Sequence, residues 1–210
     1  MITPNNSKKI TMLQLVVFDL DFCIWKPEMY QLRGPPILTC LNSIQPKVPR
    51  KRKQKTILHL KGNTNMKGMI VTDTAKNPIT IFDGASYALS EINTWKRETD
   101  CSIKNNIKVA VASCTDKPNY AHKCLDWLIV QDGSTLRSCF DLIEIKQGNK
   151  IRHFENLHRI TGIPYQEMCF FDDYDFNIES VASRGVKCFH TPRGMTKDIW
   201  FSALDEFNLN

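Results

Sequence analysis

The 210 residues, of which 42% are hydrophobic and 24% charged, suit a globular protein with a real core and exclude a disordered or fibrous chain. No stretch approaches the roughly 20 apolar residues that a membrane helix needs, so we expect no membrane partner. The net charge of +6 resides in one run, residues 47–55, which holds six basic residues and no acidic one.

The eight cysteines are scattered and none forms a C-x-x-C pair, which disfavours both a zinc site and a disulfide framework. Several stand inside apolar runs such as Met168-Cys169-Phe170, as small core residues of a reducing compartment do. We therefore expect a cytoplasmic monomer. The basic run 47–55 leaves open a nuclear import address, an anionic partner or a solvated loop.

In chain order, the apolar residues 13–18 predict a first buried strand. Residues 22–82 have no helical period and contain several prolines and the basic run. Strand-like pieces lie at residues 56–60, 69–72 and 79–82. We predict a flap or hairpin insertion here, within a single domain that spans residues 1–210.

From Asp83 onward, helical and strand patterns alternate. Strands are predicted at residues 107–112, 140–145, 167–171 and 186–190. Helices are predicted from Asp83, after a cap at Asp116 with Pro118 in the first turn, at 149–161 and 175–184, and from Thr196. This alternation predicts a mainly parallel sheet with helices on both faces, and ligands bind such sheets beyond the carboxyl ends of the strands.

Polar residues stand at four of these strand ends. They are Asp19 and Asp21 after the first strand, Ser113 and Cys114 after the second, Lys150 at the start of a helix, and Asp172 and Asp173 after the fourth. Clustered carboxylates repel one another unless a cation neutralises them, and oxygen ligands suit Mg²⁺. A lysine and a hydroxyl are suited to holding phosphate oxygens. The joint placement therefore predicts a metal-assisted phosphate site.

These residues also carry a family resemblance. The stretches Val16-Val17-Phe18-Asp19-Leu20-Asp21, Ala112-Ser113, Lys150 and Phe170-Phe171-Asp172-Asp173 resemble the four motifs of the haloacid dehalogenase (HAD) superfamily. Leu20 to Trp25, residues 148–158, and Asn177-Ile178 after the last motif resemble its magnesium-dependent phosphatases. The similarity covers about residues 13–40 and 78–207. It implies a Rossmannoid three-layer α/β/α sandwich with a small flap and no large cap domain.

The resemblance also implies roles for the residues. Asp19 would be the nucleophile that forms an aspartyl-phosphate, and Asp21 the general acid and base. Mg²⁺ would be held by Asp19, by the backbone carbonyl of Asp21 and by Asp172, with Asp173 acting through water or orienting its neighbours. Ser113 and Lys150, with Cys114 beside them, would bind the substrate phosphate. An acid at Asp21 favours phosphoryl transfer over dehalogenation, because a dehalogenase has no leaving oxygen to protonate.

Cys23 departs from the Thr or Val usual in this family, and its thiol is a weaker hydrogen-bond donor for the loop. A cysteine-type phosphatase mechanism through Cys23 is rejected because the chain lacks the C-x5-R phosphate loop. We expect the three histidines near the motifs, His153, His158 and His190, to be packing or helix-surface residues rather than ligands.

A site without a cap would be open to a phosphoprotein, phosphotyrosine or a sugar phosphate, and the sequence does not choose among them. Trp25 and Tyr30 could stack on a substrate ring or pack the flap. The alternative function is a HAD-fold binding protein that engages nucleic acid or an acidic partner through residues 47–55. No aromatic residue interleaves with that run, so a base-stacking surface is not indicated, and clustered carboxylates argue against a scaffold.

Overall fold

The computed structural model describes residues 12–40, 68–98 and 103–209. Its centre is a sheet of five parallel strands in the order β7-β6-β1-β8-β9. The strands are β1 (Leu15–Phe18), β6 (Lys108–Ser113), β7 (Leu142–Ile145), β8 (Met168–Asp172) and β9 (Lys187–His190). The predicted parallel α/β sheet is therefore confirmed.

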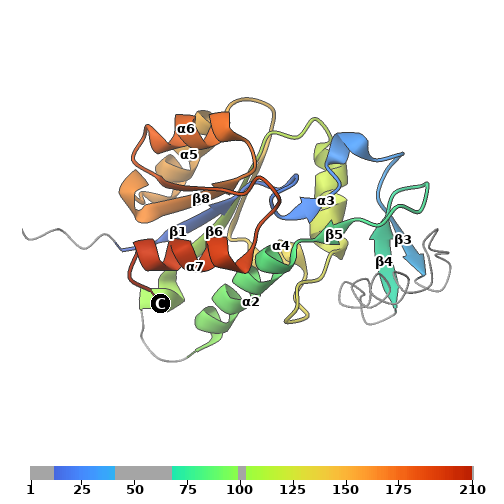
Figure 1. Cartoon of the computed structure of the whole chain (residues 1–210), viewed down its shortest axis with the longest axis horizontal. Helices are drawn as coiled ribbons and strands as arrows, with labels where there is room; N and C mark the ends of the chain where they lie inside the picture. The colour runs from blue at the N-terminus through green and yellow to red at the C-terminus, as the bar shows by residue number, and fades with distance from the viewer. Residues whose placement is uncertain (1–11, 41–67, 99–102, 210) are drawn as a thin grey trace, which may run out of the picture.

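Helices cover both faces of the sheet. They are α2 (Asp83–Arg97), α3 (Pro118–Trp127), α4 (Leu136–Cys139), α5 (Lys150–Thr161), α6 (Asp175–Ala182) and α7 (Lys197–Glu206). Three short 3₁₀ turns accompany them: η1 (Met29–Gln31), η3 (Ile103–Asn106) and η4 (Tyr165–Glu167). In Figure 1, α5 and α6 lie above the sheet, and α2 and α7 lie below it. Within the described ranges, no helix is long and apolar enough to cross a bilayer.

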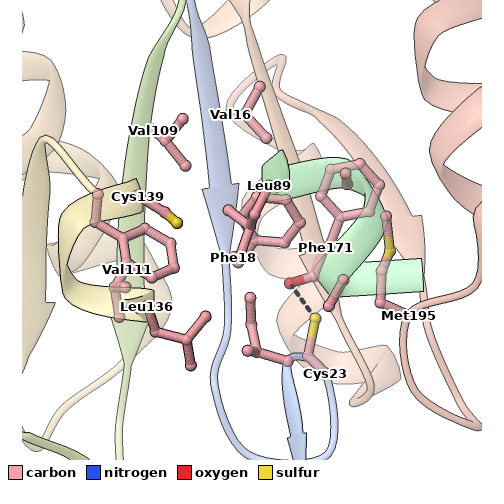
Figure 2. Packing of buried hydrophobic residues seen from close by; sticks show 14 of the residues in the cluster. Val16, Phe18, Cys23, Leu89, Val109, Val111, Leu136, Cys139, Phe171 and Met195 are labelled. Carbon is pink, nitrogen blue, oxygen red and sulfur yellow. Dashed lines mark hydrogen bonds between the residues drawn. The ribbon is translucent and has the colours of Figure 1, made fainter. Parts of the chain in front are cut away.

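Alternating side chains of each strand serve the two layers. Val16 and Phe18 point into a core with α2, α3, α4 and α7, whereas Leu15 and Val17 point into a second core with α5 and α6. Phe18 stacks on Phe171 of the neighbouring strand with ring centroids 5.0 Å apart, in the core region drawn in Figure 2. Because both faces of the central strands are buried, β1, β6 and β8 are mostly apolar, as the sequence pattern indicated. The edge strands β7 and β9 are only partly buried and contain Glu144, Lys187 and His190.

Two small antiparallel pairs make the flap. Strand β2 (Trp25–Lys26) pairs with β5 (Thr80–Ile81), and β3 (Ile37–Cys40) pairs with β4 (Met69–Thr72). The β3–β4 pair lies at the far side of the molecule from the N-terminal end of β1 (Figure 1). Strands were predicted near β4 and β5 but not at β2 or β3. Strand β2 has only two residues, and β3 directly follows Pro35 and Pro36, which are typical of a loop. The predicted strand at 56–60 and the basic run 47–55 lie outside the described residues.

Helix ends follow local chemistry, with one correction. The Asn149 side chain accepts the Arg152 backbone N–H at 3.0 Å, and Gly162 ends α5 in the left-handed region with φ of 69°. The predicted cap at Asp116 is wrong, because Lys117 occupies the N-cap position and no side chain caps α3. Pro118 takes the first helical position, where its missing N–H leaves one donor fewer to satisfy.

Candidate active site

The order of the strands brings distant residues to one edge of the sheet. Asp19 directly follows β1, and its backbone N–H donates to the Phe171 carbonyl of β8 at 2.9 Å. Asp172 ends β8 on one side of β1, and Ser113 ends β6 on the other. The carboxyl ends of three adjacent parallel strands therefore supply the predicted site residues, as expected for this fold.

Three carboxylates form a compact cluster in this place. Asp19, Asp172 and Asp173 each offer an oxygen, and these oxygens lie within 4.8 Å of one another. Asp172 is fully buried and Asp19 is 7% exposed. Asn177 donates from Nδ2 to both oxygens of Asp172 at 3.1 Å, and the Tyr174 backbone N–H donates to Oδ1 at 2.9 Å. These donors fix the orientation of the Asp172 carboxylate.

Lys150 connects the carboxylate cluster to strand β6. Its buried ammonium donates to Asp19 Oδ1 at 2.5 Å, to the Ala112 carbonyl at 2.5 Å, and lies 3.0 Å from Asp172 Oδ2. Three acceptors match the three N–H donors of an ammonium, so the buried charge is fully paired. Burial opposes this charge, but the Asp19 and Asp172 carboxylates raise the pKa of Lys150, so it stays protonated.

The carboxylates themselves are electrostatically strained. Burial raises the pKa of Asp19 to about 7; Lys150 opposes the shift, while Asp172 and Asp21 add to it. Burial and then the charge of Asp172 raise the pKa of Asp173 to about 6. When all three aspartates are ionised, Lys150 compensates one negative charge and leaves two. A divalent cation fits that remainder, and an all-oxygen donor set fits Mg²⁺.

Asp21 lies beside this cluster in a different setting. Trp25 Nε1–H donates to Asp21 Oδ1 at 2.7 Å, and burial raises the pKa of Asp21. Trp25 is fully buried, so it packs the flap and orients Asp21 rather than stacking on a substrate. Tyr30, the other predicted stacking residue, is 64% exposed.

Ser113 and Cys114 lie where β6 ends. The Ser113 side chain is buried, and its Oγ accepts the Thr115 backbone N–H at the long distance of 3.4 Å. Burial raises the pKa of the Cys114 thiol, with Lys150 opposing the shift and Asp19 adding to it. The Cys114 thiol is therefore close to the charged groups of the site and is protonated at neutral pH.

Comparison with known proteins follows the same lines. Residues 11–210 match the profile of a family described as Acid Phosphatase. The chain belongs to the acid phosphatase family. It is a HAD-superfamily chain, as its motifs predicted.

Two relatives of this acid phosphatase chain differ in identity and in the length that is matched. Human magnesium-dependent phosphatase 1 is 39% identical over 84 residues, which is 37% of this chain and 48% of the human protein. The chain thus spans about half the length of that relative. A HAD-like hydrolase superfamily protein of Schizosaccharomyces pombe is 27% identical over 175 residues, 82% of each chain.

Solved structures support the fold alone. The N-terminal part of a Bacteroides fragilis protein, containing a phosphatase domain complexed with Mg, has a TM-score of 0.52 at 14% identity. That match covers 95% of this chain and 40% of the other. A haloacid dehalogenase-like hydrolase of Xanthomonas campestris also has a TM-score of 0.52, at 13% identity, over 94% of this chain and 96% of the other.

Cys23, the departure from the usual acid phosphatase pattern, lies in the turn after Asp21. Its buried thiol donates to the Phe171 carbonyl at 3.4 Å (Figure 2), and the turn uses a positive φ of 55° at Phe22. Burial raises the pKa of the Cys23 thiol well above its ordinary value. A protonated thiol directed at a backbone carbonyl is unsuited to nucleophilic attack.

The histidines differ in their relation to the site. His158 Nδ1 lies 2.7 Å from the Ile163 carbonyl, as a packing residue does. His153 is completely buried, behind Lys150 on the same helix. His190 lies closer to the site than a packing role implied, because Nε2 contacts the Asp173 carbonyl at 2.9 Å. Asn177 was given no role from the sequence, although Asn177-Ile178 is one of the stretches that resemble magnesium-dependent phosphatases. His190 was expected to be a packing or helix-surface residue.

Proposed function

We propose that this chain is a Mg²⁺-dependent phosphatase that hydrolyses phosphate monoesters through Asp19. The observation that carries the proposal is the position of Asp19, buried among the Asp172 and Asp173 carboxylates and in contact with the Lys150 ammonium. A carboxylate so placed is fixed in one orientation at the open end of the sheet. That combination suits a nucleophile better than a structural ion pair.

Asp19, Asp172 and the backbone carbonyl of Asp21 are the groups we assign to Mg²⁺, with Asp173 acting through water or on its neighbours. When bound, the ion supplies positive charge that offsets the charge of the phosphoryl oxygens. We assign the phosphoryl oxygens to the Ser113 hydroxyl and to Lys150, which would exchange one of its carboxylate contacts for a phosphoryl oxygen, with the protonated Cys114 thiol beside Ser113. The raised pKa values of Asp19 and Asp173 support this assignment, because a cation would remove their electrostatic penalty.

The reaction has two displacement steps at phosphorus. An Asp19 oxygen attacks and the bond to the ester oxygen breaks, while the Asp21 carboxylic acid gives its proton to that leaving oxygen. Asp21, now a carboxylate, takes a proton from water as the water oxygen attacks the aspartyl-phosphate and releases Asp19 and phosphate. The raised pKa of Asp21, caused chiefly by burial, suits the first role, and Trp25 holds the group in place.

Hydrolysis of para-nitrophenyl phosphate by the wild type and Asp19→Asn, with Mg²⁺ and with excess chelator, tests this mechanism. The substitution should lower turnover at least about a thousandfold, because the asparagine amide is not a nucleophile. The chelator should lower turnover by a similar factor, because without Mg²⁺ the negative charges of the aspartates and the phosphate are not compensated. Asp116→Asn is the matched control, since Asp116 is exposed in a neighbouring loop and should retain wild-type turnover. Full activity of folded Asp19→Asn would disprove the nucleophile assignment.

For the substrate, we propose aryl phosphates, including phosphotyrosine, in preference to sugar phosphates. Tyr174 and Phe176, 62% and 64% exposed, follow the Asp172–Asp173 pair, and their ring centroids are 6.3 Å apart. Exposed Tyr30 adjoins Glu28, whose charge adds to burial in raising the pKa of both Asp21 and Asp173. Two segments near the carboxylates therefore expose aromatic rings, and rings favour stacking on an aromatic leaving group.

A Tyr174→Ala, Phe176→Ala double variant tests the substrate class. We expect kcat/KM for a phosphotyrosine peptide to fall about tenfold, a loss typical of one stacking contact, with little change for glucose 6-phosphate. Ile160→Ala serves as the control, because Ile160 is 51% exposed at the far end of α5. Equal losses on both substrates would contradict selection by the aromatic rings.

A further inference from the structure

His153 is a buried titratable residue that the proposed mechanism does not use. It lies on α5, three positions after Lys150, and has no exposed surface. Its Nε2 is 3.1 Å from the Lys146 carbonyl, and since a carbonyl only accepts, Nε2 carries the proton. Nδ1 is then an acceptor, and no group among the described residues pairs with it. An apolar side chain would fill this space without burying an unpaired nitrogen. The presence of a histidine here therefore suggests that its Nε2–H hydrogen bond has a role.

The Lys146 peptide joins two parts of the phosphate site. Its carbonyl accepts from His153 on α5, while its N–H donates to the Ser113 carbonyl at the end of β6 at 3.1 Å. Lys150 spans the same gap from the other side, because its ammonium donates to the Ala112 carbonyl at 2.5 Å. Two parallel bridges thus set the separation between the end of β6 and the first turn of α5.

The loop that contains Lys146 needs such a tether. Between β7 and α5 it passes through Gly148, whose φ of 142° is open to glycine but strained for other residues. A loop with this backbone freedom does not by itself hold α5 at one distance from β6. The bond from His153 lies at the start of this loop, and the Asn149 cap lies at its end.

Neutral imidazole also suits the surroundings electrostatically. Burial and the neighbouring Lys150 charge lower the pKa of His153 to about 4. The residue therefore donates a hydrogen bond at neutral pH without adding a second positive charge beside Lys150. A lysine or arginine donor at this place would repel the Lys150 ammonium and weaken its hold on the carboxylates.

We propose that His153 is a positioning residue whose Nε2–H bond to the Lys146 carbonyl sets the separation of Ser113 and Lys150, and thereby the affinity of the site for phosphate. The inference rests on the proposed function only in taking Ser113 and Lys150 as the phosphate-binding pair. It goes beyond that function by placing the control of phosphate affinity in a residue that touches neither substrate nor metal.

Calorimetric titration of the Mg²⁺-loaded protein with inorganic phosphate tests this inference without turnover. His153→Leu removes the donor and should raise the phosphate dissociation constant about fivefold to tenfold, the loss expected for one positioning hydrogen bond. His153→Gln places an amide N–H near the position of Nε2 and should restore the constant to within about twofold of wild type. If the leucine variant does not fold, His153→Met, with its adaptable side chain, takes its place.

Leu157→Ala is the matched control for packing loss. Leu157 is buried on the same helix, one turn beyond His153 and further from Lys150, in the core that Leu15 and Val17 enter. This control variant should lower the melting temperature while leaving phosphate affinity within about twofold of wild type. A leucine or methionine variant at position 153 that binds phosphate as the wild type does, a glutamine variant that fails to restore binding, or equal weakening in Leu157→Ala overturns the proposal.

The same titration separates this inference from the proposed function. If phosphate binds, His153→Leu weakens it and His153→Gln restores it, the positioning role stands even where para-nitrophenyl phosphate is not hydrolysed, and only the proposed chemistry fails. If the Mg²⁺-loaded wild type binds no phosphate, the positioning role of His153 is overturned, and turnover of para-nitrophenyl phosphate still decides the proposed function.

Discussion

At the scale of single residues, the site is organised by the mismatch between three carboxylates and one ammonium. Lys150 pairs with Asp19 and Asp172, yet the pKa of Asp19 is still raised to about 7, chiefly by burial. No ammonium of the residues that the structure describes forms an ion pair with Asp173, and burial raises its pKa to about 6. The folded protein therefore binds protons at these groups more tightly than the unfolded chain does.

The raised pKa values of Asp19 and Asp173 make the stability of the fold depend on pH. Because the folded-state pKa values are raised, protonation favours the folded state, and stability from these groups is lost as pH rises from about 4 through about 7. Mg²⁺ offsets the carboxylate charge only when the groups are ionised. We expect Mg²⁺ to raise the melting temperature by about 4–8 °C at pH 8, corresponding to about 1–2 kcal/mol, and by less than about 2 °C at pH 5.

Scanning calorimetry at the two pH values, with NaCl matched for ionic strength, measures this difference. Asp173→Asn should shrink the Mg²⁺ shift at pH 8 and make the metal-free protein more stable there, since one half-buried like charge is removed. Equal Mg²⁺ shifts at pH 5 and pH 8 would show that these carboxylates are not the groups that bind the ion.

At the scale of elements, the first turn of α5 supplies Lys150 to the proposed phosphate site. Lys150 is the first residue of the helix, His153 is on the next turn, and Asn149 caps the N-terminus. A frayed first turn would move Lys150 away from Asp19 and Ala112, with which it makes its shortest contacts. The cap of this helix should therefore matter for activity as well as for stability.

Asn149→Ala tests this coupling. Loss of the bond from the Arg152 backbone N–H should cost about 1 kcal/mol of stability and lower kcat/KM for para-nitrophenyl phosphate several-fold. Thr196→Ala removes the corresponding cap of α7, where the Thr196 side chain accepts the Ile199 backbone N–H, and should cost a similar amount without changing kcat/KM. A fall in kcat/KM that is the same in both variants would point to general destabilisation.

At the scale of the whole molecule, the α/β body and the flap supply different groups to the candidate site. The strand ends of the sheet hold the carboxylates and α5 holds Lys150, while the flap supplies Trp25 to Asp21 and exposes Tyr30. Strands β3 and β4 pair from Ile37–Thr72 to Cys40–Met69, so the two ends of the intervening segment emerge side by side. That segment contains the basic run 47–55, and none of the proposed site residues lies within it.

Deletion of residues 47–55 therefore should leave turnover of para-nitrophenyl phosphate within about twofold of wild type and the melting temperature within about 2 °C, since none of the proposed site residues is removed. Retention on a heparin column at low salt, which reports attraction to polyanions, should fall because six basic residues are lost. Such a result would assign the run to docking. Loss of turnover in a folded deletion variant would instead make the segment part of the active site.

Local patterns in the sequence were sufficient for much of the fold. The apolar runs predicted all five strands of the sheet within a few residues, because strands covered on both faces need continuous apolar residues. The predicted cap at Asp116 was wrong, because α3 begins at Pro118 and the N-cap position therefore falls on Lys117. Strands β2 and β3 went unpredicted, because short flap strands depend on their pairing partners more than on their own composition.

The sequence by itself determined which residues stand at the strand ends, because motif spacing and hydrophobic period are local properties of the chain. Only the tertiary structure decided their contacts. Lys150 meets Asp19 across 131 positions of sequence, and it does so because β6 and β8 flank β1 in the sheet. The donors that orient Asp172 are local, since Tyr174 and Asn177 follow it by two and five residues. The burial of His153, by contrast, arises from packing between elements that are distant in the sequence, which no local pattern encodes.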